Sequence, residues 1–151
     1  MSKQVEAGYR NLPYFVYGTL RPGHRNFDAL LKGRIVGEPA KGTVRGFIMV
    51  SLGGFPMAIH TGNESDVIVG NLVNIRPKEF VEVTKSLDRL EGYPTFYDKL
   101  VVNALETMDA SDSTTVSKMR EAYIYASPEE TQSSYLKLYE KIIGGDWEKR
   151  S

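Results

Sequence analysis

The sequence YFVYGTLRPG, at positions 14–23, has the composition of a β-strand that stops abruptly at a glycine and continues as a turn. Tyr14 to Tyr17 have high β-propensity, and Gly18 and Pro22-Gly23 are typical of turns. A strand that stops at a glycine leaves backbone N–H groups without ladder partners, and a ligand carboxylate or oxyanion can accept hydrogen bonds from them. By itself the stretch also fits an ordinary strand and turn. A second stretch, LDRLEGYP at positions 87–94, is what favours a functional site.

The composition is that of one globular domain. The chain has 151 residues, of which 41% are hydrophobic and 25% charged, and this is enough to bury a core. We expect a single domain over residues 12–147. Residues 1–11 are polar and lack a periodic apolar pattern, so they are predicted to form a flexible N-terminal arm. No oligomeric state can be inferred from the pattern, and a monomer is the default expectation.

Charge and cysteine content exclude several classes of function. Lys plus Arg and Asp plus Glu each total 19, so no charge excess indicates a nucleic-acid partner. The absence of cysteine excludes disulfides, thiolate catalysis and Cys-ligated metal centres. No apolar run approaches the ~20 residues that a membrane span needs, and the N-terminus lacks a signal-peptide core. We therefore expect a cytoplasmic protein with no membrane partner.

The clearest secondary-structure pattern lies in the middle of the chain. Residues 67–75 are rich in β-branched side chains and predict a buried strand. Pro77 then suits the first position of a helix, and Gly92 suits its end. The apolar residues between them recur with the period of one helix face: Phe80, Val83, Thr84, Leu87 and Leu90.

Other elements complete the predicted architecture. Strands are expected over residues 41–50, 57–60, 97–106 and 120–126, the first weakened by two glycines. Residues 24–33 predict a short helix with Asn26 as a candidate N-cap, and residues 107–118 predict a long mobile loop. Strands dominate and helices are too few for repeated βαβ units. We expect an α+β fold, a small mixed β-barrel with flanking helices.

A final helix is predicted after the last strand. Ser127, Pro128 and Glu130 match a capping box, with Ser127 as the cap. The helix is expected to end at Gly144-Gly145. Its apolar face would be Tyr135, Leu138, Tyr139, Ile142 and Ile143.

Glu91 is the carboxylate with the most unusual predicted surroundings. It follows Leu87 by four residues, so it borders the apolar face of the helix. It also lies at the helix C-terminus, where the macrodipole disfavours a negative charge. Both effects raise the pKa of a carboxyl group, and a glutamate with a raised pKa can shuttle protons near neutral pH. The alternative is an exposed glutamate just before a glycine cap.

Other candidate groups are compatible with several roles. Asp88 can orient the site, or it can pair with Lys85 or Arg89. Four tyrosines are candidates for core or groove wall, and one or two of them can present a hydroxyl to a ligand: Tyr123, Tyr125, Tyr135 and Tyr139. His24 and His60 lack a third ligand nearby in the sequence, so no metal site is expected. The signatures G-x-S-x-G, Walker A and G-x-G-x-x-G are absent as well.

Together, VYGTL at 16–20 and LDRLEGY at 87–93 resemble the γ-glutamylcyclotransferase-like superfamily, and within it the γ-glutamylamine cyclotransferase and avirulence-induced-gene-like branch. Comparable residues occur as GFPMA at 54–58, VGNL at 69–72, Phe96-Tyr97 and GDW at 145–147. The resemblance thus spans residues 14–147. It implies a small β-barrel, in agreement with the pattern above.

The resemblance also implies an activity. Glu91 would be the catalytic acid/base in the cyclisation of a γ-glutamyl amine or γ-glutamyl amino acid to 5-oxoproline, an intramolecular acyl transfer that cleaves an amide and needs no cofactor. Tyr17, Gly18, Thr19 and Leu20 would line the substrate cavity, and we expect Tyr97 and Tyr123 to contact the substrate too. Phe55, Tyr93, Phe96 and residues 108–118 would surround the leaving amine, whose identity the sequence leaves open.

Two further readings of the same residues stay open. The first is a non-catalytic binding module that retains the cavity for a γ-glutamyl-like or other small ligand. The second is a different γ-glutamyl transfer, such as removal of a γ-glutamyl protecting group. The chain also departs from the family pattern at Lys99, where family members often have arginine. Lysine keeps the charge but loses bidentate geometry, which puts a carboxylate contact at this position in question.

Overall fold

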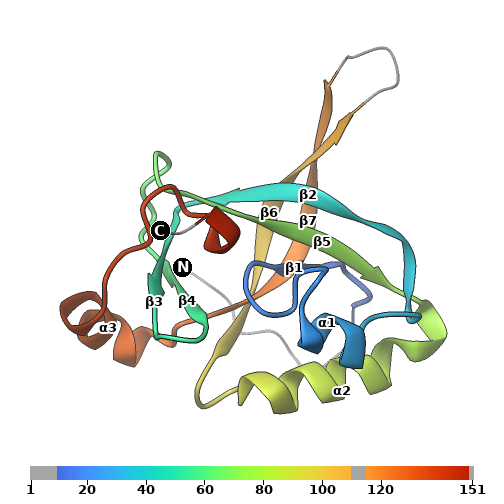
Figure 1. Ribbon diagram of the computed structural model, residues 1–151, viewed down its shortest axis with the longest axis horizontal. Coiled ribbons are helices and arrows are strands. Elements are labelled where there is room, and N and C mark those ends of the chain that lie inside the picture. Colours follow the sequence, from blue (N-terminus) through green and yellow to red (C-terminus); the bar gives the residue numbers. More distant parts are fainter. Residues whose placement is uncertain (1–9, 110–114, 150–151) are drawn as a thin grey trace.

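The computed structural model describes residues 10–109 and 115–149. Five strands of this part form a closed barrel in the order β1-β5-β2-β6-β7 (Figure 1). Their bounds are Tyr14–Val16 (β1), Ile35–Arg45 (β2), Val67–Ile75 (β5), Asp98–Asp109 (β6) and Thr115–Ala126 (β7). Neighbouring strands are antiparallel except β1 and β7, whose parallel pairing at Tyr14 and Tyr123 closes the barrel. The predicted α+β barrel is confirmed.

A separate hairpin lies beside the barrel. It consists of β3, Phe47–Ser51, and β4, Pro56–His60. The predicted strand over 41–50 is therefore two strands, because Gly46 adopts a left-handed φ of 86° between β2 and β3. A residue with a side chain rarely adopts this backbone conformation, so the glycine marks the corner where the chain leaves the barrel.

Helices flank the barrel. They are α1, Arg25–Leu30, α2, Phe80–Glu91, and α3, Gln132–Leu138, with 3₁₀ turns at Pro77–Glu79, Glu129–Thr131 and Trp147–Lys149. Figure 1 shows α1 and α2 close together, and α3 beyond the β3–β4 hairpin. The predicted helix between Pro77 and Gly92 is confirmed, including its left-handed end at Gly92, where φ is 65°.

The barrel strands alternate between two apolar clusters. On β7, Tyr123 and Tyr125 join a cluster that includes the buried face of α2, whereas Ile124 joins a cluster that includes Trp147. This alternation follows from the period-two geometry of a strand. Gly70 on β5 allows β1 to approach closely, because a Cβ there would lie 2.4 Å from the carbonyl oxygen of Val16.

Several local predictions are wrong. Asn26 is not a cap: it lies inside α1, and its amide bonds Thr19 instead. The capping box is not formed, because the Ser127 hydroxyl bonds the carbonyl of Pro128 and the hydroxyl of Thr131.

The C-terminal helix is shorter than predicted, ending at Leu138 and burying none of its residues. Leu138, Tyr139 and Ile143 are exposed. Ile142 is buried, but it lies after the helix, in a segment that forms backbone hydrogen bonds with β3. The predicted loop over 107–118 is largely strand, since β6 and β7 pair as far as Asp109 and Thr115. Residues 1–9 of the predicted arm lie outside the described residues.

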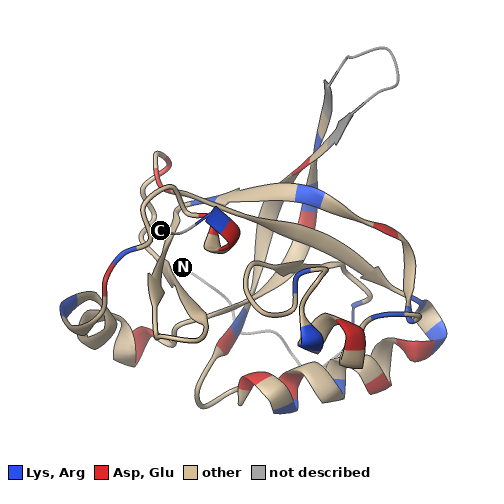
Figure 2. Ribbon diagram, viewed as in Figure 1, with Lys and Arg blue, Asp and Glu red and all other residues tan. Residues whose placement is uncertain are grey.

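Acidic and basic residues both occur along the described chain. Figure 2 shows acidic and basic positions interspersed along α2. Within the described residues, no helix combines the length and the apolar character needed to cross a membrane.

Candidate functional site

A pocket of about 250 Å³ opens where β1, α2 and the β3–β4 hairpin meet. It is lined by Phe15, Val16, Tyr17, Gly18, Thr19, Leu20, Asn26, Gly54, Phe55, Pro56, Leu90, Glu91, Phe96, Tyr97 and Tyr125. The two stretches that the sequence analysis singled out thus meet in one cavity. A hollow of about 330 Å³ elsewhere, along β2 and β6, contains none of the predicted site residues.

Glu91 reaches the pocket because of its place on α2. The helix buries Phe80, Val83, Thr84 and Leu87, and Glu91 continues this face by one turn. The turn closes at Gly92, with the N–H of Tyr93 donating to the carbonyl of Asp88 at 3.0 Å. Burial raises the pKa of the Glu91 carboxyl to about 7. The group therefore exchanges its proton near neutral pH, as the sequence predicted.

The loop after β1 forms the opposite wall. β1 pairs with β5 up to Val16 and Asn71, and the backbone then turns, with the N–H of Arg21 donating to the carbonyl of Gly18 at 3.1 Å. Gly18 packs against Pro56 so closely that a Cβ would lie 2.7 Å from its ring. Among the described residues, no hydrogen-bond acceptor takes the backbone N–H of Gly18, Thr19 or Leu20.

Three tyrosines form the floor of the pocket. The hydroxyl of Tyr17 donates to the carbonyl of Tyr125 at 2.7 Å and accepts from the N–H of Ala58 at 3.0 Å. The hydroxyl of Tyr97 donates to the carbonyl of Pro56 at 2.7 Å, and that of Tyr125 to Asp88 Oδ1 at 2.6 Å. Burial raises the pKa of all three hydroxyls, so they stay protonated and bonded to the protein. Their rings shape the pocket.

The structure does not bring Tyr123 into the pocket. Its ring packs on Tyr14, with ring centroids 5.1 Å apart, and its hydroxyl donates to the carbonyl of Arg10. Tyr125, two residues further along the same strand face, lines the pocket instead. Asn26 also lines it, which no sequence signal indicated. Of the predicted walls around a leaving amine, Phe55 and Phe96 line the pocket, whereas Tyr93 does not; the side chains at 108–116 lie outside the described residues.

Asp88 pairs with neither of the partners predicted for it. Its carboxylate bonds Lys99 Nζ at 2.7 Å and the hydroxyl of Tyr125. Lys85 pairs with Glu82 instead. Asp88 does not line the pocket, but it accepts a hydrogen bond from Tyr125, which does, and Lys99 contacts a carboxylate.

The histidines do not converge. His24 Nε2 contacts Glu148 Oε2, and the ring of His60 lies edge-on to Phe47. Among the residues that the structure describes, no three His, Asp or Glu side chains are placed to hold a metal ion.

The fold and the pocket define a class: a small β-barrel with flanking helices and a part-enclosed cavity, sized for a small molecule, that holds a carboxyl group titrating near pH 7. Residues 14–149 match the family described as gamma-glutamyl cyclotransferase, AIG2-like, and the chain belongs to that family.

Solved structures show the same fold. An AIG2-like protein from Mus musculus is 18% identical, with a TM-score of 0.63 and 87% of each chain covered. YkqA from Bacillus subtilis is 20% identical, with a TM-score of 0.55; the match covers 91% of this chain and only 40% of YkqA. At5g39720.1 from Arabidopsis thaliana is 19% identical, with a TM-score of 0.55, covering 83% of this chain and 75% of that one. A search of curated protein sequences found no match.

Proposed function

We propose that the protein converts γ-glutamyl amides to 5-oxoproline and a free amine, with Glu91 as general acid/base. The observation that carries the proposal is the Glu91 carboxyl, which lines the pocket and has a pKa raised by burial to about 7. A group with this pKa can both accept and donate a proton at neutral pH, as the reaction requires.

The chemistry follows from the substrate. A γ-glutamyl amide carries its own nucleophile, since the α-amine can close a five-membered ring on the γ-carbonyl carbon. The attack is intramolecular, so a pocket that folds the substrate correctly supplies much of the rate acceleration. Glu91 takes a proton from the α-ammonium group, and the free amine attacks the carbonyl. Protonated Glu91 then gives the proton to the departing nitrogen as the original amide bond breaks. The ring nitrogen loses its second proton to the re-formed carboxylate, which passes it to the released amine, so the products are a neutral lactam and an ammonium ion.

The loop after β1 supports this reaction from the other side of the pocket. The N–H groups of Gly18, Thr19 and Leu20 are donors without an acceptor among the described residues. We assign to them the developing oxyanion or the substrate α-carboxylate, both of which are anions that backbone donors stabilise. Tyr17 and Tyr97 contribute ring surface, because their hydroxyls are already bonded to the protein.

The leaving amine is assigned to the mouth of the pocket. Leu90 and Phe96, which flank Glu91, are each 42% exposed although they line the cavity, and Phe96 packs edge-on against Phe55 at 6.0 Å between centroids. Covering large apolar side chains with a ligand removes apolar surface from water, which favours binding. The proposed pose places the γ-glutamyl half against the loop and the amine half against this apolar rim.

A product assay tests the proposal. Purified protein is incubated with a panel of γ-glutamyl amides, and 5-oxoproline is measured for the wild type, Glu91→Gln and Glu82→Gln. Glu82 is a matched control because it lies on the same helix with an exposed side chain. We expect product from the wild type and from the control, and a loss of turnover of ~10² or more in Glu91→Gln.

Two outcomes contradict the proposal. Full activity in Glu91→Gln would remove Glu91 from the mechanism. No product from any amide, together with thermal stabilisation by 5-oxoproline, would identify a binding module that keeps the cavity without the reaction.

A further inference from the structure

We propose that Arg21 and Asp146 are positioning residues. Their ion pair ties the pocket loop, residues 18–20, to the C-terminal segment, residues 145–149, and sets the geometry of the loop for the reaction. The inference rests on the proposed function, because it assigns a task to residues outside the pocket. Neither residue lines the cavity, so neither is proposed to touch the substrate.

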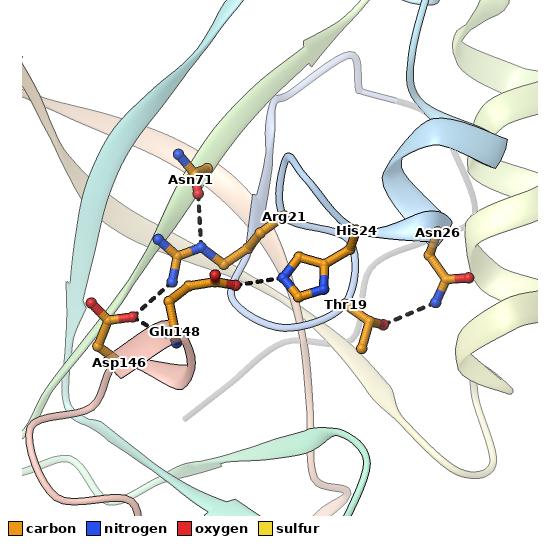
Figure 3. A network of polar contacts seen from close by, with 7 residues as sticks. All are labelled: Thr19, Arg21, His24, Asn26, Asn71, Asp146 and Glu148. Atoms are coloured by element: carbon orange, nitrogen blue, oxygen red, sulfur yellow. Dashed lines mark hydrogen bonds and ion pairs between the residues drawn. The ribbon is translucent and has the colours of Figure 1, made fainter. Parts of the chain in front are cut away.

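Arg21 is the first residue after the loop and does not line the pocket, and its guanidinium contacts Asn71 and Asp146 (Figure 3). Its Nε donates to Asn71 Oδ1 at 2.8 Å, and its Nη1 donates to Asp146 Oδ1 at 2.8 Å. Asn71 lies opposite Val16 in the β1–β5 ladder, two residues before the loop begins at Gly18. The side chain therefore bridges the barrel wall and the C-terminal segment. Only 7% of Arg21 is exposed, which makes an unpaired charge there costly.

Asp146 is itself held in place. The preceding Gly145 accepts a hydrogen bond from the N–H of Val69 at 2.8 Å, and it lies so near β5 that a Cβ would be 2.1 Å from the carbonyl oxygen of Val67. The following Trp147 is buried in the core. Asp146 Oδ1 also accepts from the N–H of Glu148 at 3.0 Å. The carboxylate that receives Arg21 is thus anchored on both sides.

Two further contacts, at Thr19 and at His24, hold this part of the chain, as Figure 3 shows. Asn26 Nδ2 donates to Thr19 Oγ1 at 2.9 Å, which ties the middle of the loop to α1. His24 Nε2 contacts Glu148 Oε2 on the C-terminal segment. The ion pair of Arg21 and Asp146 is more buried than the contact of His24 with Glu148.

The link to catalysis is geometric. Donors stabilise an oxyanion or a carboxylate only when they lie at hydrogen-bond distance from the position that it takes. A displacement of about 1 Å at such a site can lower turnover by ~10²-fold. Removing the ion pair changes none of the residues that line the pocket. It removes the bond between Arg21, next to the loop, and Asp146, which lies 125 positions away in the sequence.

The experiment compares Arg21→Gln, Asp146→Asn and the double variant with the wild type. Arg76→Gln is the matched control, since Arg76 pairs with Glu79 on the exposed surface and neither residue lines the pocket. The kinetic readouts are kcat, KM and the pH profile of kcat/KM, with protein folding checked by thermal unfolding. The readout that does not depend on activity is hydrogen exchange of the peptide covering residues 17–24.

We expect each single variant to lose ~10-fold or more in kcat/KM, with the acid limb of the pH profile unmoved because Glu91 is intact. The double variant should lose little more than either single variant, since the pair acts as a unit. Exchange over residues 17–24 should rise in all three variants and stay unchanged in the control. Asp146→Asn keeps the size of the side chain and removes its charge, whereas Asp146→Glu keeps the charge on a longer side chain. Asp146→Glu should therefore retain part of the activity that Asp146→Asn loses.

The outcomes separate the two proposals. Unchanged kcat/KM, or unchanged exchange over residues 17–24, in folded variants would overturn the positioning role. Additive losses in the double variant would do so as well, because the two residues would then act independently. If the wild type forms no 5-oxoproline at all, the proposed function fails, and the exchange data still decide whether the ion pair holds the loop.

Discussion

Lys99 Nζ lies 2.7 Å from Asp88 Oδ1, in a space enclosed by four tyrosine rings whose centroids are 5.1–5.4 Å from the ammonium nitrogen: Tyr14, Tyr93, Tyr123 and Tyr125. The Lys99 side chain is 1% exposed and that of Asp88 20%. Asp88 lies one helical turn before Glu91, so the pair fastens the C-terminal end of α2 to β6. Burial alone would lower the pKa of Lys99, but Tyr14 and Asp88 raise it above its ordinary value, which keeps the ammonium charged.

Removing either member of this pair should destabilise the fold. Asp88→Asn leaves a buried ammonium without its counter-charge, and Lys99→Met leaves a part-buried carboxylate, so each should lower the free energy of unfolding by about 3–5 kcal/mol. The double variant should lose less than the sum, because neither charge is then left alone. Urea unfolding measures the cycle. The exposed pair of Glu82 and Lys85 is the control, with changes below about 1 kcal/mol expected. Strictly additive losses would show that the two charges do not stabilise each other.

Activity should depend on pH through Glu91. As a base the carboxyl must be ionised, and its pKa is raised from 4.5 to about 7. The value of kcat/KM should therefore fall ~10-fold per pH unit below about pH 7. A pH–rate profile with γ-glutamyl substrate measures this limb. A limb near pH 4.5 would mean that Glu91 is solvated in the free protein or is not the base.

The free energy of unfolding should also depend on pH through Glu91, but it should fall as the pH rises, whereas activity rises. The folded-state pKa of Glu91 lies above the unfolded value, so the native state binds more protons between pH 4.5 and about 7. The contribution of this carboxyl to stability is greatest below pH 4.5 and is lost as the pH rises through 7. Glu91→Gln should then stabilise the protein above pH 7, by at most about 3 kcal/mol. Urea unfolding of both proteins at pH 5 and pH 8 tests this, and a variant less stable than the wild type at pH 8 would contradict it.

The apolar rim should select the leaving amine. Among the described residues that line the pocket, Glu91 is the one side chain that ionises near neutral pH, so a carboxylate on the leaving group meets apolar surface and a like charge. The kcat/KM of a γ-glutamyl benzylamide should exceed that of γ-glutamylalanine by ~10-fold or more.

A charge placed on the rim should change this preference. Phe96→Arg should narrow or reverse the ratio of the two kcat/KM values, because the guanidinium can pair with the carboxylate of γ-glutamylalanine. Phe96→Leu, which keeps the rim apolar, is the control and should leave the ratio nearly unchanged. If both variants shift the ratio equally, the rim acts by shape alone.

Local patterns were enough to predict the parts of the site that each element carries by itself. The strand before Gly18 was recognised correctly, as was the apolar face of α2 except at Leu90, which is 42% exposed. The four-residue spacing from Leu87 placed Glu91 on the buried side. The helical pattern gave a wrong prediction in the C-terminal part of the chain, where apolar residues recur with a helical period but do not form a buried helix face. Leu138 and Ile143 fit a helical period, yet both are exposed, because the chain after α3 turns aside to pair with β3.

The sequence alone determined the barrel class, the helix that carries Glu91 and the turn at Gly18, since these follow from periodicity, β-propensity and glycine conformation within short stretches. The tertiary structure decided that Tyr125 lines the pocket in place of Tyr123, that Asp88 pairs with Lys99, and that Arg21 meets Asp146. These contacts join residues far apart in the chain. They depend on strand register and barrel closure, which no local pattern specifies.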